Sequence, residues 1–255
     1  MTHIYALVNQ KGGVGKTTTT INLGAYLAQM NQKALLVDLD PQANTTSCLG
    51  IDKRKVKTSV YDVLIDDARP ADAVLVSSKL NLSLLPSTPD LSGAEVELVN
   101  ELARETRLKT RLAPLVRQFD YVLVDCPPSL SLLTVNALVA AEAVIIPVQC
   151  EYLALEGLGQ LVQTINRVRS ALNSSLTVRG VVMTMFDART GLSTQVVSEV
   201  RKHFPGKVFK SIIPRSVRLA EAPSHGVPIS AFAATSTGAQ AYRALAEELL
   251  KGDNR

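Results

Sequence analysis

The stretch that decides the fold lies near the start of the chain and reads Gln10-Lys11-Gly12-Gly13-Val14-Gly15-Lys16-Thr17-Thr18. An apolar run over residues 4–8 predicts a buried strand before it, and apolar spacing over residues 19–29 predicts a helix after it. This order is the context of a phosphate-binding loop, in which backbone N–H groups converge on an anion at a helix N-terminus. We therefore expect a nucleoside triphosphate here, with Lys16 on the β- and γ-phosphates and the Thr17 hydroxyl on Mg²⁺.

The loop departs from the common G-x-x-x-x-G-K-[S/T] form at its beginning. The first glycine of that form would fall at position 10, which is Gln10. An additional lysine, Lys11, stands directly before the paired glycines. The residues alone give no reason for this lysine.

Two further predicted strands end in carboxylates. Residues 33–39 predict a buried strand that leads into Asp38 and Asp40, which would point to the same side if the strand persists. Residues 121–125 are a mainly apolar strand that closes on Asp125, a Walker B pattern, and the two prolines of Cys126-Pro127-Pro128 end it. Carboxylates at the carboxyl ends of strands beside a phosphate loop can reach Mg²⁺ or the attacking water.

The rest of the chain alternates between strand and helix patterns. Strands are expected at 80–85, 143–148, 176–185 and 207–213, and helices at 95–118 (broken or kinked near Pro114), 151–172, 192–204 and 238–251. This alternation predicts an α/β fold, with residues 1–255 as a single doubly wound domain. Its central sheet would be mostly parallel and flanked by helices, with the site at the carboxyl ends of the strands.

Composition excludes several classes of protein. With 255 residues, 46% hydrophobic and 20% charged, the chain is long enough and apolar enough for a sizeable core. The three cysteines show no C-x-x-C pair, so neither a disulfide framework nor a zinc site is expected. No apolar run approaches the ~20 residues that span a bilayer, and we expect a cytoplasmic protein. The net charge of +4 permits contact with polyanions.

Taken together, the stretches 11–18, 37–42 and 124–128 resemble the deviant Walker A P-loop ATPases, and within them the ParA/Soj chromosome-partitioning ATPases. The stretches 147–152, 154–158, 185–190 and 213–226 are similar to the same family. The resemblance therefore covers nearly the whole chain, and it implies a slow ATPase that forms a homodimer on binding ATP and Mg²⁺.

The resemblance also implies roles for single residues. Lys11 would reach the nucleotide of a second subunit and stabilise charge on the γ-phosphate, Asp40 would orient the hydrolytic water, and Lys16 would complete the catalytic set. Thr17, Asp40 and Asp125 would serve the metal. The nucleotide would be held by Lys11, Gly12, Gly13, Val14, Gly15, Lys16, Thr17 and Thr18, with Pro214 and Ser216 beside adenine and Glu151 on the opposite subunit's nucleotide.

A basic segment suggests a polyanionic partner. Residues 200–220 contain six cations and no acid, namely Arg201, Lys202, Lys207, Lys210, Arg215 and Arg218. Arg189 lies just before the preceding predicted helix. Such a surface is sufficient for sequence-independent DNA binding, and in similar proteins the residues matching Arg189 and Arg218 carry it. Two copies in a dimer would double the number of phosphate contacts.

The resemblance further implies a ParB-type, centromere-binding partner and a place on the nucleoid. A regulator of replication initiation that uses the same switch stays open as an alternative. A MinD-like membrane ATPase is disfavoured because residues 236–255 carry three cations against three acids and an apolar face without Phe or Trp.

Overall fold

The sheet at the centre of the molecule has seven strands among the residues that the computed structural model describes, which are 2–152 and 156–254. Their order is β3-β4-β2-β5-β1-β6-β7, and every neighbouring pair is parallel except β3 and β4. The strands are β1 (His3–Leu7), β2 (Ala34–Asp38), β3 (Leu75–Ser77), β4 (Leu82–Leu85), β5 (Tyr121–Asp125), β6 (Ala143–Gln149) and β7 (Thr177–Thr184). The prediction of a mostly parallel α/β sheet is confirmed.

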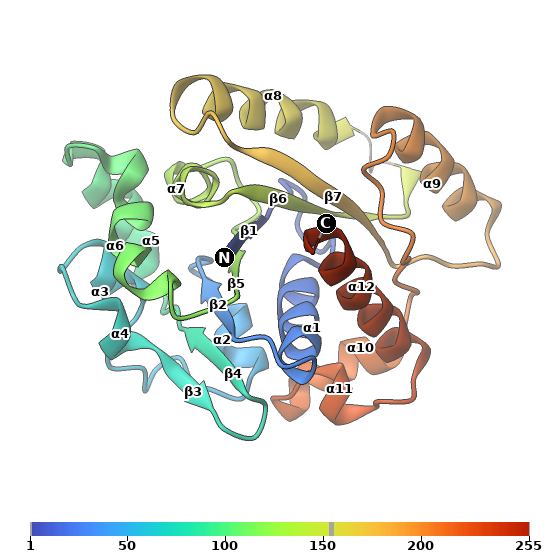
Figure 1. Cartoon of the computed structure of the whole chain (residues 1–255), viewed down its shortest axis with the longest axis horizontal. Helices are drawn as coiled ribbons and strands as arrows, with labels where there is room; N and C mark the ends of the chain where they lie inside the picture. The colour runs from blue at the N-terminus through green and yellow to red at the C-terminus, as the bar shows by residue number, and fades with distance from the viewer. Residues whose placement is uncertain (1, 153–155, 255) are drawn as a thin grey trace.

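Helices cover both faces of this sheet (Figure 1). Alternate residues of β1 enter different cores, since Ala6 packs with α6, α7, α8 and α9 while Tyr5 and Leu7 pack with α1 and α12. The longer helices are α1 (Lys16–Gln29), α5 (Leu91–Glu97), α6 (Arg107–Val116), α7 (Leu132–Ala140), α8 (Glu156–Ala171), α9 (Gly191–His203) and α12 (Thr237–Asp253). The short ones are α2 (Asn44–Cys48), α3 (Val60–Leu64), α4 (Pro70–Ala73), α10 (Val217–Glu221) and α11 (Ile229–Phe232).

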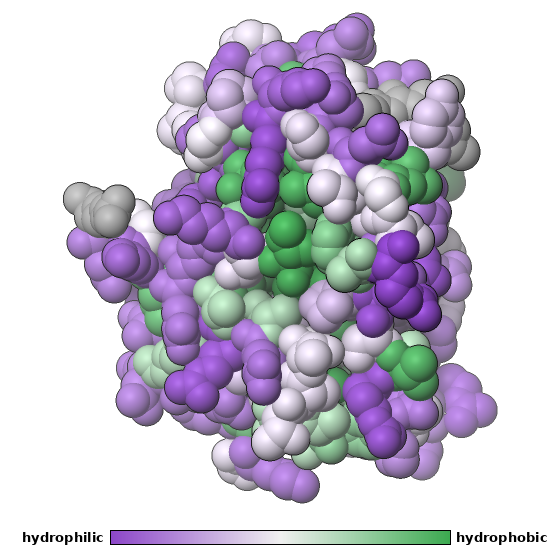
Figure 2. Space-filling view, turned by 90° about the vertical axis from the view of Figure 1, so that its right-hand side faces the viewer, coloured by the Kyte–Doolittle hydropathy of each residue, from purple (hydrophilic) through white to green (hydrophobic). Residues whose placement is uncertain are grey.

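The side of the molecule that carries α9 is mostly hydrophilic, with apolar side chains gathered in a hollow near its centre (Figure 2). On this side the segment between α9 and α10 runs along β7, the last strand of the sheet. Two isolated β-bridges connect this segment to β7 and to the residues that follow it. Val208 pairs with Val181 of β7, and Pro214 pairs with Phe186 just after the strand.

The prediction of a strand at 207–213 is wrong, because this segment makes only those isolated bridges. The N–H groups of Lys210 and Ser211 donate to the carboxylate of Glu248 on α12, at 2.8 and 3.0 Å, and not to carbonyls of β7. A side chain on a distant helix thus takes the donors that a strand would use.

The single helix expected at 95–118 is also wrong in its continuity. The chain forms α5, two short 3₁₀ turns and α6, and Ala103 between them has a left-handed backbone with φ of +54°. The Asn136 side chain accepts from Leu108 N–H at 3.0 Å and donates to the Arg104 carbonyl at 2.8 Å. Pro114, where the break was expected, lies inside α6. The helix expected at 151–172 is described from Glu156, and residues 153–155 lie outside the described part of the chain.

Gly226 seats the chain after α10 against the loop that follows α2, and it gives a test of this fold. Its φ is +65°, and a Cβ there would lie 2.6 Å from the Gly50 Cα. We expect Gly226→Ala to lower the free energy of unfolding by about 2–4 kcal/mol, from left-handed strain plus overlap with backbone. Gly206 has a φ of +70° with nothing within 4 Å, so Gly206→Ala should cost only the strain, about 1 kcal/mol. If urea unfolding shows that both variants lose the same free energy of unfolding, the close packing of Gly226 against Gly50 is contradicted.

Candidate functional site

Three strand ends come together at the carboxyl edge of the sheet. In the register, Leu7 of β1 and Asp38 of β2 each lie opposite Asp125 of β5. The phosphate-binding loop leaves β1 at this point and leads directly into α1. The parallel register therefore places the predicted loop and the predicted carboxylates side by side, as Figure 1 shows for the strands β1, β2 and β5.

The loop has the backbone that phosphate binding requires. Gly13 and Gly15 have φ values of +74° and +87°, a conformation that glycine adopts without strain. The Thr184 hydroxyl at the end of β7 donates to the Val14 carbonyl at 2.8 Å and holds the loop in place. Lys16, the first residue of α1, is 7% exposed, and its ammonium donates to the Lys11 carbonyl at 3.2 Å. Burial lowers the pKa of Lys16, while nearby Asp125 opposes that shift.

Asp125 is fully buried and accepts hydrogen bonds from one predicted site residue, Thr17, and from one residue that was not predicted, Thr45. The Thr17 hydroxyl donates to its Oδ2 at 2.7 Å, and the Thr45 hydroxyl of α2 donates to the same oxygen at 2.8 Å. Burial raises the pKa of Asp125 to about 6, and these hydrogen bonds limit the rise. Thr17 and Asp125 thus lie in contact and could together supply oxygen atoms to a Mg²⁺ ion next to phosphates.

Asp38 and Asp40 do different things, because β2 ends at Asp38. The Asp38 carboxylate is fully buried and accepts from the backbone N–H of Thr46 at 2.8 Å and from its hydroxyl at 2.7 Å. Burial, and then the charge of Asp125, raise the pKa of Asp38 to about 7. Asp40 is 6% exposed and accepts from Gln42 N–H at 2.9 Å. Its carboxylate is left with room for a further donor such as a water.

The irregular beginning of the loop contains two polar residues, Gln10 and Lys11, whose side chains can still donate hydrogen bonds. Among the described residues, the buried amide nitrogen of Gln10 has no hydrogen-bond partner. Lys11 is tied by its backbone, since its N–H donates to the Asn9 side chain at 3.0 Å, and Asn9 donates to the Pro147 carbonyl at 2.7 Å. The backbone of Lys11 is thus fixed to the end of β6.

A cleft of about 240 Å³ adjoins the loop and contains both residues expected beside adenine. Pro214 and Ser216 line it together with Gly15 and Thr18 of the loop and Tyr242 of α12. Glu151 lies beside the same segment, where it accepts from Gln149 at 2.6 Å and from the Arg215 guanidinium at 3.2 Å. In this protomer Glu151 is therefore engaged with its own chain.

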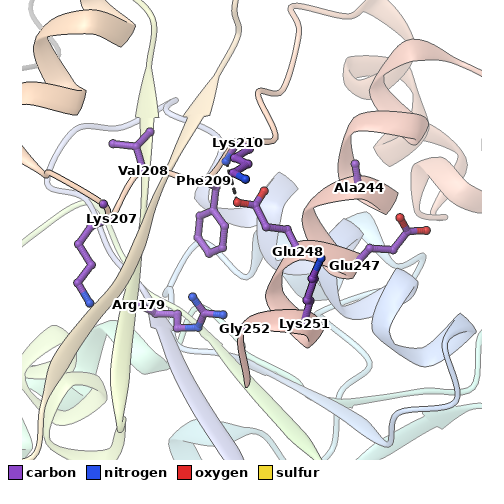
Figure 3. Close-up of a pocket in the computed structure, with 11 residues that line it drawn as sticks. Arg179, Lys207, Val208, Phe209, Lys210, Ala244, Glu247, Glu248, Lys251 and Gly252 are labelled. Atoms are coloured by element: carbon purple, nitrogen blue, oxygen red, sulfur yellow. Dashed lines mark hydrogen bonds between the residues drawn. The ribbon is translucent and has the colours of Figure 1, made fainter. Parts of the chain in front are cut away.

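The basic residues are more fully paired than a count over residues 200–220 indicates. Acids outside that window, two of them directly beside it, pair with four of the predicted cations. The pairs are Arg189 with Asp187 at 2.6 Å, Lys202 with Glu199 at 2.6 Å, Arg215 with Glu151 at 3.2 Å and Arg218 with Glu221 at 2.9 Å. All four cations are exposed, so these pairs are weak and can exchange for a phosphate. Of the remaining three, Arg201, Lys207 and Lys210, the two lysines line a groove against α12 (Figure 3).

Sequence reasoning missed the hydroxyl groups that hold the carboxylates. Thr45 and Thr46 of α2 each serve a different aspartate, and Ser87 N–H donates to the Thr46 hydroxyl at 3.0 Å. The pair of threonines five residues after Asp40 was the available signal, since hydroxyls near a buried carboxylate are its usual donors.

The residues present fit a Mg²⁺-nucleotide and not a metal held by protein alone. Among the described residues, no group of three or more His, Cys, Asp or Glu side chains could hold a metal ion. Magnesium commonly takes one or two protein oxygens and fills its shell with phosphate and water, which matches Thr17 and Asp125. No helix of the described residues is both long and apolar enough to cross a membrane.

Known proteins resemble this chain along nearly its full length. A family model described as an AAA domain matches residues 2–178. The sporulation initiation inhibitor protein Soj of Bacillus subtilis (strain 168) is 54% identical over 98% of each chain. The chromosome partitioning protein ParA of Myxococcus xanthus (strain DK1622) is 52% identical over 98% of this chain and 88% of its own. A Mycobacterium smegmatis structure named cobyrinic acid a,c-diamide synthase, with bound ATP analog and magnesium, is 40% identical, with a TM-score of 0.89 over 100% and 96% of the two chains.

The raised pKa of Asp38 predicts a pH-dependent stability in protein free of nucleotide and Mg²⁺. Between its ordinary value near 4 and about 7, folded Asp38 keeps a proton that the unfolded chain has released. Stability from this group is therefore present at low pH and lost as the pH rises through 7. The stability of Asp38→Asn minus that of wild type should grow between pH 5 and 8 in EDTA, measured by urea unfolding. A constant difference would show that Asp38 titrates normally.

Proposed function

The chain belongs to the Soj/ParA family of chromosome-partitioning P-loop ATPases, and on this premise we propose that it is an ATP-driven dimerising switch that binds DNA. The observation that carries the proposal is the contact of Thr17 with Asp125 at 2.7 Å, beside the glycine loop and its buried Lys16. That arrangement has the parts of a phosphate and Mg²⁺ site in a single ATPase domain over residues 1–255.

ATP and Mg²⁺ are the ligands that this site suits. The loop N–H groups, Lys16 and Thr18 would hold the phosphates, Thr17 and Asp125 would hold the metal, and Pro214 and Ser216 would flank the adenine. Bound Mg²⁺ would neutralise charge on the β- and γ-phosphates. Lys16 must leave the Lys11 carbonyl to reach a phosphate, and its low exposure makes that contact strong.

Hydrolysis and dimerisation would involve the remaining site residues. Asp40, with one carboxylate oxygen engaged by Gln42 N–H, would orient the attacking water with the other. Lys11 would act across the interface on the second copy's nucleotide, which makes catalysis depend on the dimer. Slow turnover belongs to the same proposal and is based on family membership.

DNA binding would use the exposed cations on α9, α10 and the loops beside them. Arg189 and Arg218 would contact phosphates, helped by Lys202, Lys207, Lys210 and Arg215. A ParB-type partner and a cytoplasmic, nucleoid-associated location follow from family membership. The membrane alternative has little support, because Tyr242, Leu245 and Leu249 of α12 are buried in the core.

Asp40→Ala should trap the ATP-bound dimer, because nucleotide binding survives while the water loses its orienting carboxylate. We expect hydrolysis to fall at least 100-fold and the protein to run as a dimer with ATP in light scattering. Lys16→Ala is the matched control, and it should stay monomeric because it loses the phosphate contact. A monomeric Asp40→Ala protein in saturating ATP would refute the role of Asp40.

Arg189→Ala combined with Arg218→Ala should weaken DNA binding equally for all sequences. Each removed phosphate contact lowers the salt dependence of log affinity by about 0.9, and affinity at 0.1 M salt about eightfold. ATP-driven dimerisation should be unchanged, since neither residue lies in the nucleotide cleft. Electrophoretic mobility shifts on two unrelated duplexes provide the measurement, and unchanged affinity would exclude this surface.

A further inference from the structure

A groove of about 470 Å³ lies at the amino end of β7, away from the nucleotide cleft. Arg179 of β7 and Phe209 of the connecting segment form its base, and Lys251 of α12 also lines it (Figure 3). Thr184, which contacts the phosphate loop, is five residues further along β7 than Arg179. At ~3.3 Å per residue the two ends are about 17 Å apart, so the groove and the nucleotide cleft are separate places.

The base of the groove is built from fixed side chains. Arg179 donates to the Asp253 carboxylate at 2.7 Å and to the Leu249 carbonyl at 3.0 Å, and its guanidinium lies 5.6 Å from the Phe209 ring centroid. The Arg179 guanidinium can take this position because residue 252 is a glycine, and a Cβ there would overlap the guanidinium. The Asp253 side chain is only 4% exposed. The base is therefore rigid before any ligand binds.

The rim of the groove is positively charged. Lys207, Lys210 and Lys251 are exposed, and none forms an ion pair with a carboxylate within the described part of the chain. Two acids, Glu247 and Glu248, also line the groove, and neither forms an ion pair with these three lysines in the described part of the chain. Glu248 accepts from the N–H groups of Lys210 and Ser211, and Glu247 pairs with Arg243 at 3.1 Å. Three ammonium groups from two elements thus remain available for an anion.

We infer that this groove binds backbone phosphates of double-stranded DNA, with Lys251 of α12 acting alongside Lys207 and Lys210. The inference rests on the proposed DNA-binding function and extends it to α12, a helix in which two cations stand against three acids. The segment 207–214 runs along β7, so the groove and Arg215 lie at the two ends of one flank. The distance of about 17 Å along β7 from Arg179 to Thr184 corresponds to about five base pairs at 3.4 Å each, so a duplex laid along this flank would pass both ends.

A salt titration of the full chain with ATP and Mg²⁺ tests the inference on a duplex of arbitrary sequence. Lys251→Ala should reduce the slope of log affinity against log salt by about 0.9 per protomer, and affinity at 0.1 M salt about eightfold. Lys251→Arg, which keeps the cation, should retain both. Lys79→Ala is the matched control, because it removes the same charge from an exposed lysine between β3 and β4, at the opposite edge of the sheet from β7, and it should leave the slope unchanged.

The outcomes separate the inference from the proposed function. If Lys251→Ala behaves like Lys79→Ala while the Arg189 and Arg218 substitutions weaken binding, the inference is overturned and the proposed function stands. If the unaltered chain with ATP does not bind duplex DNA, the proposed function fails, and the inference with it. Lys251-dependent binding of inorganic tripolyphosphate, with no change in the DNA slope, would assign the groove to a soluble polyphosphate and overturn the inference.

Discussion

The buried carboxylate of Asp125 is the group on which the arrangement of the site depends. It lies at the end of β5, with strand ends on both sides, and accepts the hydroxyls of Thr17 and Thr45. A carboxylate at this depth without donors would be strongly destabilising. Because the two hydroxyls lie on α1 and α2, one buried charge sets the position of both helices relative to the sheet.

The second carboxylate extends this arrangement toward β4. Asp38 holds Thr46 by both its N–H and its hydroxyl, and the Thr46 hydroxyl in turn accepts from Ser87 N–H. Neighbouring residues of α2 thus satisfy two different aspartates. A helix of five residues has little stability of its own, so these contacts and not local propensity keep α2 in place.

This dependence explains how far the sequence could predict the structure. Continuous apolar runs identified β1, β2, β5 and β6, and a parallel register then required Asp38 and Asp125 to meet, so the centre of the site followed from local pattern. Elements held by distant side chains could not be found in this way. Asn136 divides the region expected as one helix, Glu248 takes two N–H donors of the segment expected as a strand, and α2 depends on its aspartates. The helix α7 was missed because seven of its nine residues are buried, which removes the amphipathic period.

Arg189 and Arg218 are each paired with a carboxylate, yet both are exposed and so can still bind a phosphate. Arg189 and Arg218 each bind a carboxylate two or three residues away, which orients the guanidinium and lowers the local field. Exposed pairs of this kind contribute at most about 1 kcal/mol, which one charge-assisted contact to a phosphate can offset. The gain per contact is then small for one chain, whereas the contacts of two linked copies multiply in the equilibrium constant. If the chain binds DNA as proposed, local pairing would make that binding depend on the number of copies assembled, and a switch that controls dimerisation would control DNA binding through the same surface.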